Sequence, residues 1–135
     1  MKKSITIWII EGGISGDVLI TEAAKKIYNA GFDAVELSFN QKGEISFDSS
    51  PLYLKQLYKD IKCVNLEISS LSTLMLNEFS ITSSNIEEKK YALKLINQML
   101  EVASIMEIPT VQISPGKVTF VDSYKDVYQR SLEEC

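Results

Sequence analysis

Carboxylates, hydroxyls, amides and lysines are the side chains with which this sequence could do chemistry, because its 135 residues contain no histidine. Histidine is the usual proton carrier at neutral pH and the commonest metal ligand. Two glutamates have an informative spacing: Glu36 and Glu67 each alternate with hydrophobic residues in a short apolar segment, as on the polar face of a β-strand. A buried carboxylate is costly unless it is paired, so each glutamate needs a partner there.

The composition predicts one globular domain over residues 1–135, since 45% of the residues are hydrophobic and 24% are charged. The net charge of −4, without a cluster of basic residues, argues against a nucleic-acid or membrane-binding surface. The N-terminus faintly resembles a signal peptide, but its apolar run is interrupted by Glu11 and no small-residue cleavage pattern follows, so a cytoplasmic location is expected. Cys63 and Cys135 form no CxxC motif, and we expect a core thiol and a terminal thiol.

Four short segments rich in β-branched residues predict β-strands. They cover residues 4–10, 33–39, 63–70 and 110–114. Helical periodicity lies between them, over residues 17–30, from Ser50-Pro51 onward, over residues 85–107 and from about Asp122. Gly31 is expected to stop the first helix, and Ser84 with Glu87 to form a capping box on the third.

The order strand, helix, repeated four times, predicts a parallel sheet with right-handed crossovers. The strands are two-sided: Val35, Leu37 and Phe39 share one face, and Ala34, Glu36 and Ser38 share the other. The segments 63–70 and 110–114 repeat this pattern. It favours the α/β fold of a (βα)4 half of a TIM barrel, with helices on the outer face and a polar interior. A sheet with one face in water and a flavodoxin-like sheet are the alternatives.

Several stretches of the sequence carry a family resemblance. Residues 31–37 read Gly-Phe-Asp-Ala-Val-Glu-Leu, the run from Glu88 to Ile113 has the character of a helix followed by a strand, and Ser114-Pro115-Gly116 follows as a small-residue turn. These segments resemble the xylose-isomerase-like TIM-barrel superfamily. The superfamily includes sugar-phosphate isomerases, ketose 3-epimerases, inosose dehydratases and apurinic-site endonucleases, and the likeness spans nearly all of the chain.

The resemblance implies a sugar or sugar-phosphate isomerase or epimerase, which transfers a proton next to a ketose carbonyl with help from a divalent metal. The family's Glu, Asp, His and Glu metal ligands belong to the second half of a barrel of about 250 residues. We therefore expect an N-terminal fragment that binds no metal by itself and is inactive alone. The endonuclease branch is disfavoured, because its first-half histidines are missing here.

What the first half would supply is the wall of a sugar pocket. Glu36 matches the family's strand-two glutamate, and fixing neighbouring strands is its competing role. Trp8 would place a ring under the sugar or pack in the core, while Glu67 and Gln112 would bind hydroxyls or serve packing. The polar residues 77–85 form either a substrate-side loop or an ordinary one. No catalytic residue is assigned.

A non-catalytic alternative remains open at this point. A half-barrel leaves the edges of its sheet unpaired, which is a hazard that proteins normally cover. The chain would then be an interaction or structural module, a homo-oligomer in which open edges pair.

Overall fold

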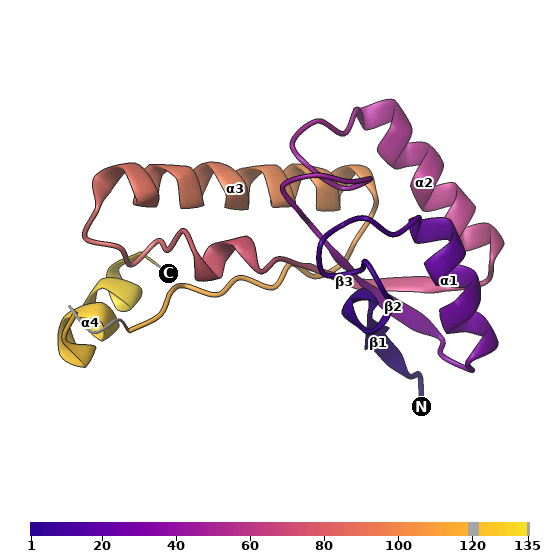
Figure 1. The fold of residues 1–135 in the computed structure, drawn as a ribbon, viewed down its shortest axis with the longest axis horizontal. Helices are drawn as coiled ribbons and strands as arrows, with labels where there is room; N and C mark the ends of the chain where they lie inside the picture. The colour runs from indigo at the N-terminus through magenta and orange to yellow at the C-terminus, as the bar shows by residue number, and fades with distance from the viewer. Residues whose placement is uncertain (119–121, 135) are drawn as a thin grey trace.

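The structure, a computed structural model, describes residues 1–118 and 122–134, and Figure 1 shows its course. Strands and helices alternate as predicted as far as residue 105. The elements are β1 (Ser4–Thr6), the 3₁₀ turn η1 (Ile7–Ile9), α1 (Ile20–Asn29), β2 (Ala34–Ser38), α2 (Pro51–Cys63), β3 (Glu67–Ser72), the 3₁₀ turn η2 (Met75–Asn77), α3 (Ile86–Ile105) and α4 (Tyr124–Glu134).

The strands β1, β2 and β3 form a parallel sheet in that order. The helices α1, α2 and α3 lie along one side of it, with α2 in contact with both of the others (Figure 1). Val35, Leu37 and Phe39 are at most 1% exposed and join the helices in one hydrophobic core. The predicted (βα) partial TIM barrel, with parallel strands and outer helices, is therefore confirmed.

The predicted fourth strand is wrong in its extent. Of residues 110–114, only Val111 forms a bridge, parallel to Leu71. Two backbone hydrogen bonds hold it, from Leu71 N to Thr110 O at 2.9 Å and from Gln112 N to Leu71 O at 2.8 Å. Ile113, expected on the apolar face, is 37% exposed. This segment contacts the edge of the sheet at one point and then leaves it.

A bulge in β3 interrupts the simple alternation of faces. Val35 pairs with Ile68 and Glu36 with Ser70, so Ser69 is an extra residue on β3. An added residue moves the following side chains to the opposite faces. As a result Ile68 and Leu71 both point into the core, although they are three positions apart in the strand, where strict alternation would place them on opposite faces.

The start of β3 differs from the prediction because α2 is longer than expected. Ser50 caps α2, accepting a hydrogen bond from Tyr53 N at 3.2 Å, and Pro51 opens the helix as predicted. The helix continues to Cys63, which is exposed, so the expected core thiol is wrong. Asn65 then takes a left-handed conformation, with φ of 62°, that turns the chain toward the sheet. Cys135 lies outside the described residues.

The start of α3 is also corrected. Asn85, not Ser84, is its N-cap: the Asn85 side-chain oxygen accepts from Glu87 N at 2.9 Å and Glu88 N at 3.5 Å. Asn and Ser are about equally good N-caps, so the path of the backbone decides which of the two residues begins the helix. The stop predicted for α1 is confirmed, since Gly31 has φ of 85° and its N–H bonds Tyr28 O at 2.9 Å.

The first strand is shorter than predicted, because the backbone after Thr6 tightens into η1. The beginning of α1 has no cap from Leu19, and Glu44 supplies it from a distant loop: its carboxylate accepts hydrogen bonds from Ile20 N and from the Tyr53 hydroxyl. None of the helices among residues 1–118 and 122–134 has both the length and the apolar character that a membrane span requires.

Candidate functional site

A row of polar side chains crosses the face of the sheet that the helices leave uncovered. Glu36, half-buried in the middle of β2, accepts a hydrogen bond from Ser70 Oγ at 2.7 Å. Ser70 Oγ lies 3.4 Å from Ser69 Oγ, which is 2.7 Å from Ser4 Oγ. The bulge makes this row possible, because it places two consecutive serines of β3 within reach of the neighbouring strands. The partner that a carboxylate in this position requires is thus a hydroxyl group.

This row lines an open depression of about 290 Å³, together with Ile5 and Thr6. Glu36 faces it with the rest of its hydrogen-bonding capacity, since a carboxylate accepts at about four positions and Ser70 uses one. A polyhydroxylated ligand is a natural complement to such an array of acceptor and hydroxyls. The predicted inward position of Glu36 agrees with this geometry.

Trp8 lies in η1, directly after the C-terminal end of β1, where barrel enzymes place their active sites. It is half-buried against the core, so it has a packing role. Its Nε1 is the one buried side-chain polar atom without a hydrogen-bond partner among the described residues. An unsatisfied buried N–H costs roughly 1–3 kcal/mol, and an oxygen that reached Trp8 Nε1 would recover part of that cost.

Glu67 is separated from this group. It is the first residue of β3, at the opposite end from the loops that follow the strands, and its side chain is 49% exposed. Lys2 Nζ donates to the Glu67 carboxylate at 2.7 Å. This hydrogen bond and the charge of Lys2 hold the pKa of Glu67 below its usual value. The geometry gives Glu67 the role of a surface ion pair.

Gln112 is exposed, and it follows the bridge that Val111 makes to β3. Because Val111 pairs with Leu71, whose side chain points into the core, Gln112 belongs to the opposite face. That is the face of Glu36 and Ser70. Gln112 therefore shares their side of the sheet, but it does not line the depression at Glu36.

Comparison with known proteins places this arrangement in a family. The family model described as Xylose isomerase-like TIM barrel matches residues 24–135. The chain belongs to this family. No curated protein matches its sequence.

Two solved structures have the same fold as this xylose isomerase-like chain. One is D-psicose 3-epimerase in the presence of D-fructose, and the other is D-psicose 3-epimerase with D-tagatose from Clostridium cellulolyticum H10. Each matches with a TM-score of 0.74 and 14% sequence identity, over 99% of this chain and 46% of the other. The chain thus spans about half the length of these structures, and at this identity the likeness establishes the fold alone.

A divalent metal, expected for the full-length xylose isomerase-like proteins, does not fit the described residues. Among residues 1–118 and 122–134, no three His, Cys, Asp or Glu side chains come together in a way that could hold a metal ion. Glu36 is surrounded by hydroxyls, which are weak ligands compared with carboxylates and imidazoles. No chemical step through a metal is assigned to these residues.

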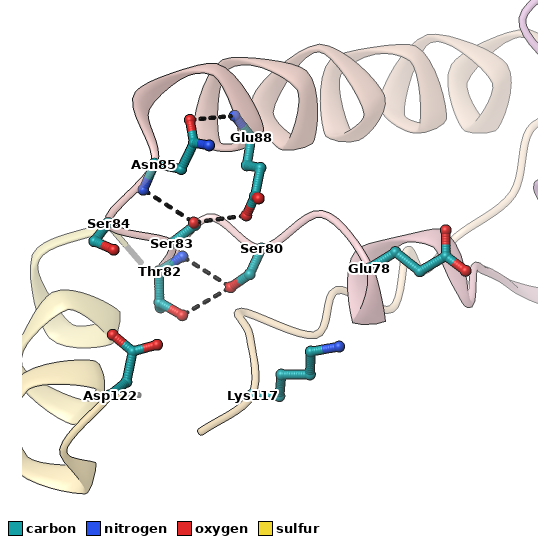
Figure 2. Close-up of a pocket in the computed structure, with 9 residues that line it drawn as sticks. All are labelled: Glu78, Ser80, Thr82, Ser83, Ser84, Asn85, Glu88, Lys117 and Asp122. Carbon is teal, nitrogen blue, oxygen red and sulfur yellow. Dashed lines mark hydrogen bonds between the residues drawn. The ribbon is translucent and has the colours of Figure 1, made fainter. Parts of the chain in front are cut away.

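A second cavity, of about 250 Å³, lies beyond the C-terminal end of β3 (Figure 2). The loop that follows η2 and the first turn of α3 form one part of its lining, and Lys117 and Asp122 come from the later chain. The polar character of residues 77–85 indicated a substrate-side loop, but nothing in the spacing of Glu88 or Lys117 pointed to this cavity.

Proposed function

We propose that this chain forms the sugar-binding wall of a ketose isomerase or epimerase, with Glu36 as the principal hydrogen-bond acceptor for the substrate. One observation carries the proposal: the half-buried Glu36 carboxylate lies in a row of hydroxyls on the face of the sheet opposite to α1, α2 and α3. Membership of the xylose isomerase-like family and the fold of D-psicose 3-epimerases solved with ketoses support it.

Each residue of this wall has a distinct task. Ser70 donates to Glu36 at 2.7 Å and fixes the orientation of the carboxylate. The remaining lone pairs of Glu36 accept from ring or chain hydroxyls of the sugar. Trp8 offers the accessible part of its aromatic ring from the end of β1, and Gln112 offers an amide from the same side of the sheet. Together they orient the ketose so that its carbonyl end faces the region where proton transfer takes place.

The substrate class in this proposal is a ketose or ketose phosphate, in a cytoplasmic protein. The single tryptophan of the sequence makes a direct test possible. The whole chain is titrated with D-fructose, D-tagatose and D-psicose while Trp8 fluorescence is recorded. We expect a saturable change, and Glu36→Gln is expected to weaken binding about 10- to 150-fold, since hydrogen bonds to a charged group contribute about 1.5–3 kcal/mol.

Glu67→Gln is the matched control, because it removes the same charge from the same sheet outside the depression. Equal loss of affinity in both variants would contradict the proposal, and so would the absence of binding for every ketose. Analysis of the sugar after incubation then determines whether the chain itself interconverts ketoses.

A second candidate function is an interaction module, and the edge of the sheet favours it. The outer side of β1 has no neighbouring strand among the described residues, and such an edge is a template for pairing with another chain. Light scattering after size-exclusion chromatography gives the oligomeric state. The Thr6 N–H points to the outer edge and Thr6 has a φ of −75° that proline can adopt. A dimer that Thr6→Pro converts to a folded monomer would support edge pairing, whereas a wild-type monomer would argue against it.

A further inference from the structure

The polar row on the sheet connects Glu36 to a residue of β1. Ser4 of β1 and Ser69 of β3 lie in strands that are both neighbours of β2, and their hydroxyl oxygens are 2.7 Å apart. Ala34, the β2 residue in register with Ser4, has a small side chain that leaves room for this contact across the middle strand. The first residue of β1 is thereby joined to the strand that supplies the partner of Glu36.

The direction of the hydrogen bonds in this row follows from the number of hydrogens available. A serine hydroxyl has one hydrogen to donate and two lone pairs with which to accept. Ser70 gives its hydrogen to the Glu36 carboxylate at 2.7 Å, so it accepts in its contact with Ser69 at 3.4 Å. Ser69 has then used its hydrogen, and Ser4 is the donor in their contact. All three hydrogens therefore point along the row toward Glu36.

Each hydrogen bond in such a row strengthens the next one. A hydroxyl that accepts a hydrogen bond becomes a better donor, by about 10–30% per bond in condensed phases. The last donor of this row faces a carboxylate, whose hydrogen bonds are among the stronger ones in proteins. The contact from Ser69 also limits rotation of the Ser70 hydroxyl about its Cβ–Oγ bond. Ser69 and Ser4 thus influence the Glu36 carboxylate through Ser70.

The contact between Ser4 and Ser69 is not needed to hold the strands together. The backbone pairs β1 with β2, and Lys3 O accepts hydrogen bonds from Asp33 N at 2.9 Å and from Ala34 N at 3.1 Å. Ser4 is exposed, and the loss of an exposed side chain usually has little effect on stability. An effect on Glu36 is therefore what distinguishes this serine pair from a contact that only joins strands.

We propose that Ser4 and Ser69 are positioning residues for Glu36, and that they act through Ser70 to hold its carboxylate in one orientation toward the depression. Their value for ligand binding rests on the proposed function, in which Glu36 is the acceptor for a ketose. An acceptor that is fixed in advance loses less conformational entropy when a ligand binds. Two serines on different strands thereby become part of the site, although the hydrogen bond to the carboxylate comes from Ser70.

The test observes the Glu36 carboxyl carbon by NMR, in the whole chain labelled with ¹³C at the glutamate side-chain carboxyls and without any sugar. The resonance that is absent from Glu36→Gln identifies it. Ser4→Ala removes the first hydroxyl of the row and is expected to shift this resonance, whereas Ser4→Thr restores a hydroxyl and is expected to return it toward its wild-type position. Ser72→Ala is the matched control, because Ser72 lies on the same strand as Ser69 but gives its hydrogen to Leu37 O at 3.4 Å. It should leave the Glu36 resonance unchanged.

A ketose titration of the same variants gives the second readout. Ser4→Ala and Ser69→Ala are each expected to weaken ketose binding about 1.3- to 5-fold, since the row changes a hydrogen bond to a charged group by about 10–30%. A Glu36 resonance that stays in place in Ser4→Ala, or that Ser4→Thr does not restore, would overturn the positioning role even where ketoses bind. If the resonance shifts and recovers but no ketose binds, the positioning role stands and the sugar-binding role fails.

Discussion

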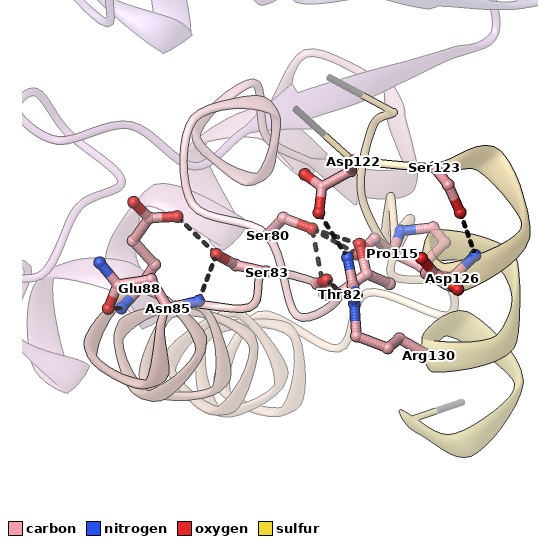
Figure 3. A network of polar contacts seen from close by, with 10 residues as sticks. All are labelled: Ser80, Thr82, Ser83, Asn85, Glu88, Pro115, Asp122, Ser123, Asp126 and Arg130. Atoms are coloured by element: carbon pink, nitrogen blue, oxygen red, sulfur yellow. Dashed lines mark hydrogen bonds and ion pairs between the residues drawn. The ribbon is translucent and has the colours of Figure 1, made fainter. Parts of the chain in front are cut away.

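The sheet core and the α4 segment are held in place by different forces. In the sheet core, formed by β1–β3 with α1–α3, apolar side chains such as Leu37 and Leu95 are completely buried. In the α4 segment, residues 122–134, only Val127 is buried among the hydrophobic residues, and Tyr124, Tyr128 and Leu132 are between 53% and 70% exposed. Arg130 attaches this segment to the loop after β3 by donating to Thr82 O, and it also pairs with Asp122 inside the segment (Figure 3).

This difference shows that an amphipathic sequence pattern does not reveal which interactions attach a helix to the rest of the protein. Both regions show amphipathic periodicity, yet many buried apolar side chains stabilise one, whereas in the other only Val127 is buried and Arg130 donates to Thr82 O of the β3–α3 loop. Hydrophobic burial acts over the whole cooperative unit, whereas one polar attachment controls a local opening. The following predictions test that contrast.

The largest effect is expected from one substitution made in both regions. Leu37→Ala in β2 should lower the free energy of unfolding by about 2–5 kcal/mol, since it removes a fully buried side chain and leaves a cavity. Leu132→Ala in α4, where the side chain is 60% exposed, should change it by less than about 0.5 kcal/mol. Urea denaturation followed by circular dichroism measures both, and similar losses would show that α4 belongs to the same core.

Removal of the polar attachment should have a smaller and local effect. Arg130→Ala removes the Nε donor to Thr82 O and one contact of Asp122, at a cost of about 1–3 kcal/mol. We expect faster hydrogen exchange in α4 and in residues 80–85, with the amides of β2 unchanged. Arg130→Lys, which keeps the charge but not both contacts, should behave in the same manner. Faster exchange throughout β2 would contradict a local attachment.

Helix caps allow a finer comparison of the two regions. Ser50 caps α2 in the sheet core, and Ser123 accepts from Asp126 N at 3.2 Å at the start of α4. Replacement by Ala costs about 1 kcal/mol at a typical cap. For Ser50→Ala this loss should appear in the global unfolding midpoint, while for Ser123→Ala it should appear only in exchange of the α4 amides. A global shift in both variants would remove the distinction.

The smallest effect should be a dependence on alkaline pH within the sheet core. Burial, followed by the hydrogen bond to Glu44, raises the pKa of the Tyr53 hydroxyl to about 12. A raised pKa means that the folded chain favours the neutral phenol, so this stabilisation is complete below about pH 10 and is lost as the pH rises toward 12. Unfolding midpoints measured across this range should fall more in the wild type than in Tyr53→Phe. Parallel curves would show that the Glu44 contact has no such role.

The fold could be predicted from the sequence wherever the spacing of the apolar residues matches the buried face of the helix or strand. The apolar stripe of α3 and the alternation of Val35, Leu37 and Phe39 correspond to the buried faces of the structure. Boundaries were less predictable because local chemistry competes: apolar residues after Thr6 form a 3₁₀ turn, and α2 extends through Cys63. The weak fourth strand shows that alternation in residues 110–114 does not guarantee a ladder of hydrogen bonds.

The candidate site was predictable in part for the same reason. The face that Glu36 occupies follows from its neighbours, but its contact with Ser70 depends on the bulge, which no periodicity reveals. Glu67 has the same parity and lies at the other end of the sheet, because the strand begins later than predicted. Whether Glu36, Trp8 and Gln112 bind a sugar is still a prediction.

The extra residue in β3 has a consequence for how this sheet tolerates change in length. Because Ser69 is the extra residue, Ile68 before it and Leu71 after it both reach the core. The hydroxyls of Ser69 and Ser70 lie together on the other side of the sheet. Deletion of one residue here would force a choice between burying a serine and exposing a leucine. Surface loops tolerate changes in length at little free-energy cost. In β3 a change of one residue would move the following side chains to the opposite faces, and the polar row at Glu36 would be lost.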